Sequence, residues 1–203
     1  MTVIGSTMDD LTVPSGLTVH ARAVWPAADG DALPPIAGFI VSSFNPLVAE
    51  VAERCLRAHY GHPPADPGRA ATTAVVLASV RGDTTTATAV ADALATGRWV
   101  PPLLFFQSNP NAVVGHIAAR WGLAGPVVCT SPAGDALADG LAVAGLLLAD
   151  GAATEVLVIT ADLAADAPDA GGTSPGTDAG DRDAAVAVLV GPPRPAAAAD
   201  QRP

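Results

Sequence analysis

The sequence predicts an α/β fold in which a mostly parallel, five-stranded sheet is flanked by helices. Three observations lead to this prediction. Short uncharged apolar runs such as 155–161 are typical of strands that are buried on both faces. The segments between these runs carry start and stop signals for helices. Half of the 203 residues are hydrophobic and only 15% are charged, which excludes general disorder and allows one sizeable core.

Each expected strand has its own pattern. The first alternates between apolar and polar residues, the third follows a Gly-Pro turn, and the others are apolar almost throughout. Residues 61–70 and 99–107 lack such patterns, and we expect them to be irregular. The five expected strands are residues 17–25, 73–80, 127–131, 155–161 and 184–190.

Four helices are expected between these strands. An Asn-Pro or Ser-Pro pair opens three of them, because Asn and Ser cap helices well and Pro fits the first helical turn. A glycine closes the last three. The four expected helices are residues 46–59, 86–96, 111–121 and 132–150.

The chain is expected to hold one domain with two short appendages. Residues 1–15 are polar and punctuated by Pro, which indicates a flexible arm. Residues 16–191 carry all the expected elements and form the domain. Residues 192–203 are rich in Pro and Ala, which indicates a disordered tail.

Composition excludes several classes of function. The net charge is −10 and every basic residue is an Arg, which argues against nucleic-acid binding, Schiff-base chemistry and a Walker-type phosphate loop. Cys55 and Cys129 have no metal or disulfide spacing, so we expect no metal, no cofactor and a reducing compartment. No segment reads as a signal peptide or a membrane span, so a cytoplasmic protein is expected.

Residues 105–162 resemble the middle of a β-ketoacyl synthase. Asn111, Gly115, the Gly125-Pro126 pair and Gly151 match landmarks of that family in order and at compatible spacing. The glycine-containing approach to the strand 184–190 also resembles the family, and the whole resemblance covers roughly residues 17–191. It implies a thiolase-like fold, in which two βαβαβαββ units pack together. This chain has room for one unit.

The resemblance also implies that the family's nucleophile is missing. Members attack a thioester with a Cys at the start of the central helix, but Gly134 occupies that position here, whether counted from Gly151 or from Gly125-Pro126. Glycine has no side chain and cannot form an acyl-enzyme. The family's two catalytic His residues belong to the second unit, which this chain lacks.

Other polar residues have a structural and a functional interpretation. Cys129 is a core residue of a strand or a displaced nucleophile, and Asp162 is a turn residue or part of a site at the strand ends. The resemblance implies that an acyl tunnel, if one is present, is lined by a small set of residues. That set is Phe105, Phe106, Asn111 and His116.

The expected helix 132–150 is apolar on nearly all sides and therefore needs cover from a second chain. The strand at 127–131 is a second candidate interface, because the family dimerises through it. We expect a β-ketoacyl synthase subunit or a second copy as the partner, with an acyl carrier protein reached through the complex. The expected interface residues are Val127, Val128, Cys129, Thr130, Leu137, Leu141 and Leu148.

These features predict a non-catalytic auxiliary subunit of a type II polyketide or fatty-acid synthase. It would resemble a chain length factor and would stabilise an active ketosynthase or shape its acyl tunnel. Two alternatives remain open. One is a small acyltransferase or thioester hydrolase that uses Cys129, and the other is a degenerate, non-functional half-gene product.

Overall fold

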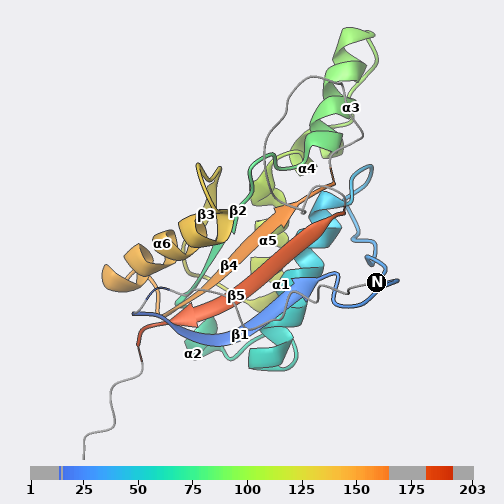
Figure 1. Cartoon of the computed structure of the whole chain (residues 1–203). Helices are drawn as coiled ribbons and strands as arrows, with labels where there is room; N and C mark the ends of the chain where they lie inside the picture. Colours follow the sequence, from blue (N-terminus) through green and yellow to red (C-terminus); the bar gives the residue numbers. More distant parts are fainter. Residues whose placement is uncertain (1–13, 15, 165–181, 194–203) are drawn as a thin grey trace, which may run out of the picture.

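The computed structural model describes residues 14, 16–164 and 182–193, which form one sheet and its flanking helices (Figure 1). The strands lie in the order β1-β5-β4-β2-β3. In chain order the elements are β1 (Thr18–Trp25), α1 (Phe44–Tyr60), α2 (Pro67–Ala70), β2 (Thr73–Ala78), α3 (Thr84–Ala95), α4 (Pro102–Gln107), α5 (Pro110–Trp121), β3 (Val127–Thr130), α6 (Ala136–Ala149), β4 (Glu155–Asp162) and β5 (Ala184–Gly191).

The five-stranded α/β sheet that the sequence predicts is confirmed, and it is mixed. β3, β2 and β4 run parallel, whereas β5 is antiparallel to both β4 and β1. Parallel neighbours need a crossover, which α3 to α5 supply between β2 and β3, and α6 supplies between β3 and β4. The carboxyl ends of the three parallel strands therefore meet at one end of the sheet.

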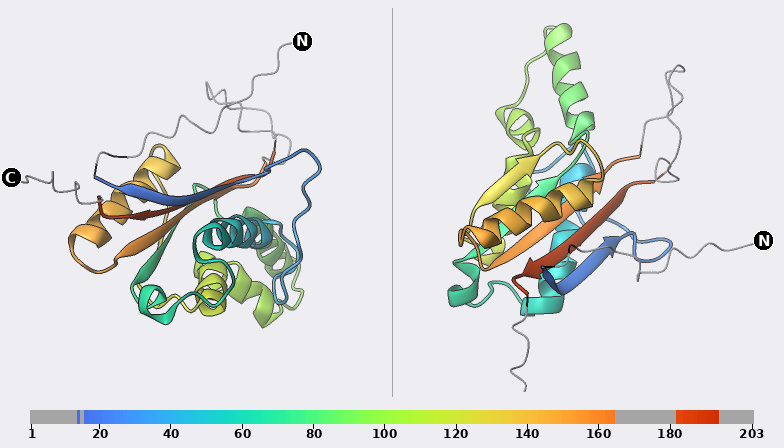
Figure 2. Two further views of the ribbon diagram at one scale, coloured as in Figure 1. Left: turned by 90° about the horizontal axis from the view of Figure 1, so that it is seen from below. Right: turned by 60° about the vertical axis from the view of Figure 1, so that its left-hand side comes forward.

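The two faces of the sheet carry separate halves of the core. Alternate residues of β2 illustrate this: Val75 and Leu77 pack with α1 and α5, whereas Ala74 and Val76 pack with α6. Figure 2 shows α1 and α5 on one side of the sheet and α6 alone on the other. The outward side of α6 includes the exposed Leu146, and no other element of the described residues covers the helix on that side.

Helices differ from the expectation in several places. Residues 67–70, expected to be irregular, form α2, because the Asp66 carboxylate caps its start. α1 begins at Phe44 with Ser43 at its N-cap position, so the expected Asn45 cap is wrong. Residues 102–107 form α4 rather than an irregular segment, because Pro102 lies within the first turn, where a missing N–H costs nothing. The central helix begins at Ala136 rather than at Pro132. The Asp135 carboxylate caps it by accepting the Ala138 N–H at 2.7 Å, which leaves residues 131–135 as a loop.

Some expectations concern residues outside the described part of the chain. The arm predicted at 1–15 lies outside it except for Pro14, and the tail predicted at 192–203 lies outside it except for Pro192 and Pro193. Among the described residues, no helix has the length and apolar character needed to cross a bilayer.

Candidate functional site at the carboxyl end of the sheet

The carboxyl ends of β2 and β3 border a shallow cavity of about 350 Å³. Ala78 of β2 pairs with Thr130 of β3, so the segments that follow the two strands leave the sheet side by side. Sites of open α/β sheets gather at such an end. The cavity is lined by Leu77, Ser79, Val80, Arg81, Gly82, Pro110, Cys129, Thr130 and Ser131.

Gly134 lies in the exposed loop between β3 and α6. A Cβ built on it would meet no atom within 4 Å, so space alone does not exclude a side chain. The backbone N–H groups of Ala133 and Gly134 point to the Asp139 carboxylate, with N–O distances of 3.0 Å and 3.4 Å. N–H groups of this kind could otherwise stabilise an oxyanion, but here they already face a negative charge.

Cys129 lies within β3, half-buried, and its thiol donates a hydrogen bond to Asn111 Oδ1 at 3.1 Å. Burial raises the pKa of the Cys129 thiol, so less thiolate forms at neutral pH than in a free cysteine. An amide oxygen cannot take up the thiol proton. The surroundings of Cys129 therefore do not activate it as a nucleophile.

Asp162 is the last residue of β4 and lies at the same end of the sheet. Its Oδ1 is buried and has no hydrogen-bond partner among the described residues. Burial raises the pKa of Asp162, although the Arg81 charge and hydrogen bonds from Ser79 and the neighbouring backbone oppose this effect. Since Arg81 donates to the Leu163 carbonyl at 2.7 Å, this region holds the turn after β2 against the end of β4.

A separate cavity of about 360 Å³ lies between α4, α5 and the loop before α1. Three of the four predicted tunnel residues, Phe106, Asn111 and His116, line it, and His116 packs edge-on against the Phe39 ring. Phe105 is exposed and lies outside this lining. Because Asn111 also bonds Cys129, the cavity lies close to the edge strand β3.

The family of β-ketoacyl synthase N-terminal domains matches residues 26–191. The chain belongs to this family. The match covers most of the domain, and the thiolase-like fold that the sequence predicted is confirmed. None of the curated proteins matches the sequence.

Solved structures of ketosynthase complexes share the fold. A ketosynthase in complex with its chain length factor from Xenorhabdus doucetiae gives a TM-score of 0.63 and 19% identity over 88% of this chain and 79% of that chain. The ishigamide ketosynthase/chain length factor gives 0.60 and 18% over 93% and 64%. A type II polyketide synthase acyl-carrier protein in complex with its ketosynthase gives 0.58 and 15% over 87% and 62%.

These overlaps describe the length of the chain relative to its structural relatives. This chain spans less than two thirds of the matched chains in the ishigamide complex and in the ketosynthase–carrier protein complex. The matched chain from Xenorhabdus doucetiae is only slightly longer than this one, since similar shares of both chains overlap. Identities below one fifth establish the shared fold alone.

The predicted interface residues divide into two groups. Within the described part of the chain β3 pairs only with β2, so Val127, Val128, Cys129 and Thr130 form an edge strand of the sheet. Leu141 is 1% exposed because it faces the sheet. Leu137 and Leu148 of α6 are partly buried, and they pack against the core cluster that contains Leu141.

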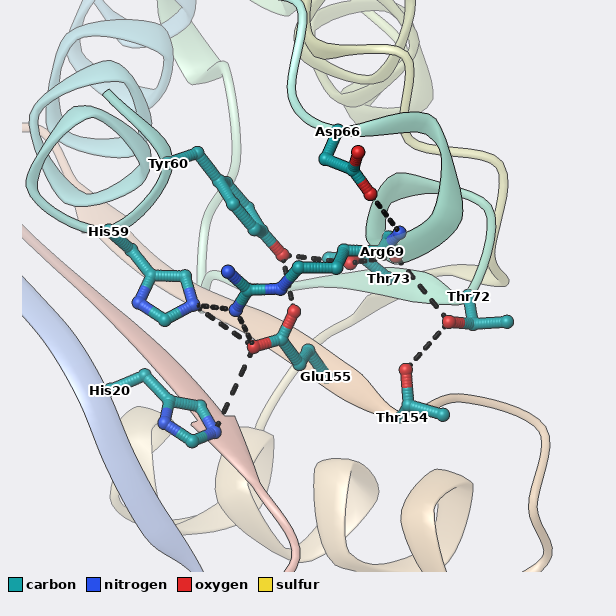
Figure 3. A network of polar contacts seen from close by, with 9 residues as sticks. All are labelled: His20, His59, Tyr60, Asp66, Arg69, Thr72, Thr73, Thr154 and Glu155. Carbon is teal, nitrogen blue, oxygen red and sulfur yellow. Dashed lines mark hydrogen bonds and ion pairs between the residues drawn. The ribbon is translucent and has the colours of Figure 1, made fainter. Parts of the chain in front are cut away.

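The amino end of the sheet carries a polar cluster that sequence reasoning missed (Figure 3). Glu155, the first residue of β4, is buried. It accepts hydrogen bonds from the Tyr60 hydroxyl at 2.7 Å and the Arg69 guanidinium at 2.6 Å, and His59 Nε2 lies 3.0 Å from it. The same Arg69 nitrogen also contacts His59.

His20 reaches this cluster from β1 because of a β-bulge. The register of β1 against β5 shifts between Val19 and Ala21, which re-aims the intervening side chain. The His20 ring stacks on the His59 ring with centroids 5.2 Å apart, and its Nε2 lies 3.9 Å from Glu155. A glutamate at the start of an otherwise apolar strand was the signal that could have revealed this cluster.

Proposed function

We propose that the chain is a non-catalytic partner subunit of a ketosynthase in a type II polyketide synthase, resembling the N-terminal half of a chain length factor. One observation supports this above all. Gly134 lies where the family's nucleophile would be, and its backbone N–H already donates to the Asp139 carboxylate. A thioester carbonyl at this loop would find neither a nucleophile nor a free oxyanion site.

A chain of comparable length occurs in a solved ketosynthase–chain length factor complex. The matched chain of the ketosynthase–chain length factor complex from Xenorhabdus doucetiae is only slightly longer. The uncovered outward face of α6 also favours assembly with another chain.

The two edges of the sheet differ in how well they could accept a partner strand. β1 carries a bulge at His20 and a charged Arg22, devices that discourage edge pairing. β3 has the sequence VVCT and carries neither a charge nor a register shift. We therefore infer that the ketosynthase pairs with β3, through Val127, Val128, Cys129 and Thr130.

The cavity lined by Phe106, Asn111 and His116 lies next to this edge and supports a contribution to the partner's acyl tunnel. Its lining is mainly apolar, as an acyl chain requires. A carrier protein would then deliver the chain through the ketosynthase, in the cytoplasm. The alternative enzyme that uses Cys129 lacks geometric support, because the bonded partner of the thiol is an amide oxygen.

Co-purification with the ketosynthase encoded nearest to it tests the proposal, with a matched pair of edge variants. Val127 is 43% exposed on β3 and Val19 is 42% exposed on β1. Val127→Arg should raise the Kd for the ketosynthase by more than about tenfold, because it buries an unpaired charge, and Val19→Arg should leave the Kd unchanged.

Two results would overturn the proposal. One is a monomer that never binds a ketosynthase, and the other is a stoichiometric acyl adduct on Cys129 with turnover in the absence of any partner. A stable self-dimer that is lost in Val127→Arg would instead identify a second copy as the partner of this edge.

A further inference from the structure

The loop before α1 holds a β-branched residue in a backbone conformation that L-residues avoid. Val41 has φ 80°, and among the described residues it is the only one other than glycine with a positive φ. Branching at Cβ makes this region especially unfavourable, and such strain persists only where surrounding contacts enforce it. The side chains of Ile40 and Val41 are 54% and 58% exposed, so they gain no burial that would offset the strain.

Gln107 enforces this conformation. It is the last residue of α4 and its side chain is fully buried. Its Oε1 accepts the Ile40 N–H at 2.9 Å, and its Nε2 donates to the Ile40 carbonyl. Both backbone groups of Ile40 are thus paired with one side chain, and relaxation of the loop would leave a buried amide unsatisfied.

A second set of bonds fixes Gln107 itself. Asn45 is buried near the start of α1. Its side-chain amide donates to the backbone carbonyl of Gln107 at 3.3 Å and to Asp83 Oδ2 at 2.9 Å. The other oxygen of Asp83 caps α3 by accepting the Thr86 N–H at 3.0 Å. One buried network therefore joins the loop to the start of α3 and the end of α4, which together project from the body of the molecule (Figure 1).

The two segments that meet where Gln107 binds Ile40 carry exposed apolar side chains and no charge of their own. Segments 32–49 and 99–115 contain no charged residue, although the chain carries a net charge of −10. Aromatic and aliphatic side chains that face solvent are typical of the buried centre of a protein interface. Those exposed beside Ile40 and Val41 in these segments are Trp99, Leu103, Phe105 and Phe106.

We propose that the Ile40–Val41 tip is a binding contact that inserts into an apolar surface of the ketosynthase, and that Gln107 is its positioning residue. This inference rests on the proposed function. The exposed apolar side chains of these two uncharged segments fit a protein partner that is apolar at this point, whereas a phosphate-bearing or strongly acidic partner would need basic side chains within them. The strained backbone at Val41 is retained because this conformation of the loop is the one that binds the ketosynthase.

This arrangement predicts opposite effects on stability and on binding. Val41→Gly removes both the strain and the side chain, because glycine adopts positive φ freely. The Tm of the chain should rise by about 3 °C, while the Kd for the ketosynthase should rise about tenfold. Val41→Asn, which also tolerates this region, should behave in the same way. Val19→Ala on β1 is the control for loss of an exposed valine and should change neither quantity by much.

A double-mutant cycle tests the role of Gln107. Gln107→Leu should weaken binding in the wild-type background, because the tip is released, but should cost little further affinity in the Val41→Gly background. A purely structural role would give the same loss in both. Equilibrium binding to the purified ketosynthase and thermal unfolding of each variant provide the measurements.

The outcomes separate this inference from the proposed function. If the wild-type chain does not bind the ketosynthase, both are wrong. If it binds and Val41→Gly binds equally well, or if Val41→Gly lowers the Tm, only the present inference is overturned. If Val41→Gly weakens self-association and leaves ketosynthase binding intact, the assigned partner is wrong and a second copy occupies the surface.

Discussion

The two ends of the central sheet use their polar residues in different ways. At the amino end, four side chains from three other elements converge on the buried Glu155 (Figure 3). At the carboxyl end, where the family's chemistry would take place, the polar contacts are divided among several separate groups, such as Arg81 with the Leu163 carbonyl and Asn45 with Asp83. Asp139 binds the backbone of its own N-terminal loop, and Asp135 caps its own helix.

This difference indicates where polar contacts hold the fold together. The cluster at the amino end joins α1, α2, β1 and β4, so it holds together elements that are far apart in sequence. The carboxyl end retains its cavity but has no side chain at position 134. The polar contacts that gather on Glu155 therefore serve the scaffold, which favours the proposed role as a partner subunit.

The largest effect should follow from disruption of the amino end. Glu155→Ala leaves Arg69, His59 and Tyr60 without their shared acceptor and should lower the free energy of unfolding by about 3 kcal/mol. This is the low end of the range for buried ion pairs, because the Arg69 side chain is 45% exposed and partly screened. Urea unfolding of the chain, in the assembly in which it purifies, measures the effect.

Glu50→Ala is the matched control for this prediction. Glu50 also binds an arginine, Arg54 at 2.7 Å, but it does so along one helix near the surface. Loss of such a pair should cost about 0.5 kcal/mol. Equal losses in the two variants would contradict the view that the Glu155 cluster holds the fold more strongly than a single ion pair within one helix.

A smaller effect should appear in the pH dependence of stability. Burial works to raise the pKa of Glu155, but hydrogen bonds from Tyr60, Arg69 and His59 outweigh it and lower the pKa. Its contribution is therefore present above the unfolded pKa, about 4.3, and is lost as the pH falls below that value toward the folded pKa. Glu155→Gln should flatten the fall in stability between about pH 5 and pH 3. An unchanged slope would assign the acid sensitivity to other carboxylates.

Sequence reasoning identified the strands well because burial on both faces leaves a simple pattern. The runs at 73–80 and 155–161 correspond to β2 and β4, and the Asn109 cap of α5 was also read correctly. The start of α6 was missed because Ser131-Pro132 carries the same signal as a real helix start. Asp135, four residues later, is the residue that caps the helix.

The candidate site was predicted only in part, because most of its properties depend on contacts between distant residues. The loss of the nucleophile at Gly134 could be read by counting along the chain. The contact of Asp139 with the Gly134 N–H could not be read in this way, since it needs the loop geometry. The bonds from Gln107 to Ile40 cross 67 residues and leave no local pattern.

The fit of α6 against the sheet should also be sensitive to small changes. A Cβ on Gly140 would lie 2.7 Å from Val158 Cγ1, so Gly140→Ala should shift the helix and cost about 1 to 2 kcal/mol. Gly145, on the same helix, has no atom within 4 Å of such a Cβ. Gly145→Ala should therefore stabilise the chain by about 0.5 kcal/mol through helix propensity. Effects of the same sign would mean that α6 does not pack on the sheet through Gly140.

The loop that carries Gly134 should tolerate change almost completely. Because a side chain there would meet open space, Gly134→Cys should alter the free energy of unfolding by less than about 0.5 kcal/mol. The introduced thiol should react with iodoacetamide faster than the native cysteines, because burial raises the pKa of both Cys55, to about 12, and Cys129.

The same variant separates lack of a nucleophile from lack of a site. We expect the introduced thiol to form no acyl adduct with an acyl-carrier thioester, since the Asp139 carboxylate still faces the loop N–H groups and would repel an oxyanion. Adding Asp139→Asn removes that charge with little change of shape and should allow a slow adduct, seen by mass spectrometry. Rapid acylation of Gly134→Cys alone would mean that the carboxyl end kept a working site and lost only one side chain, and the contrast between the two ends would then be far weaker.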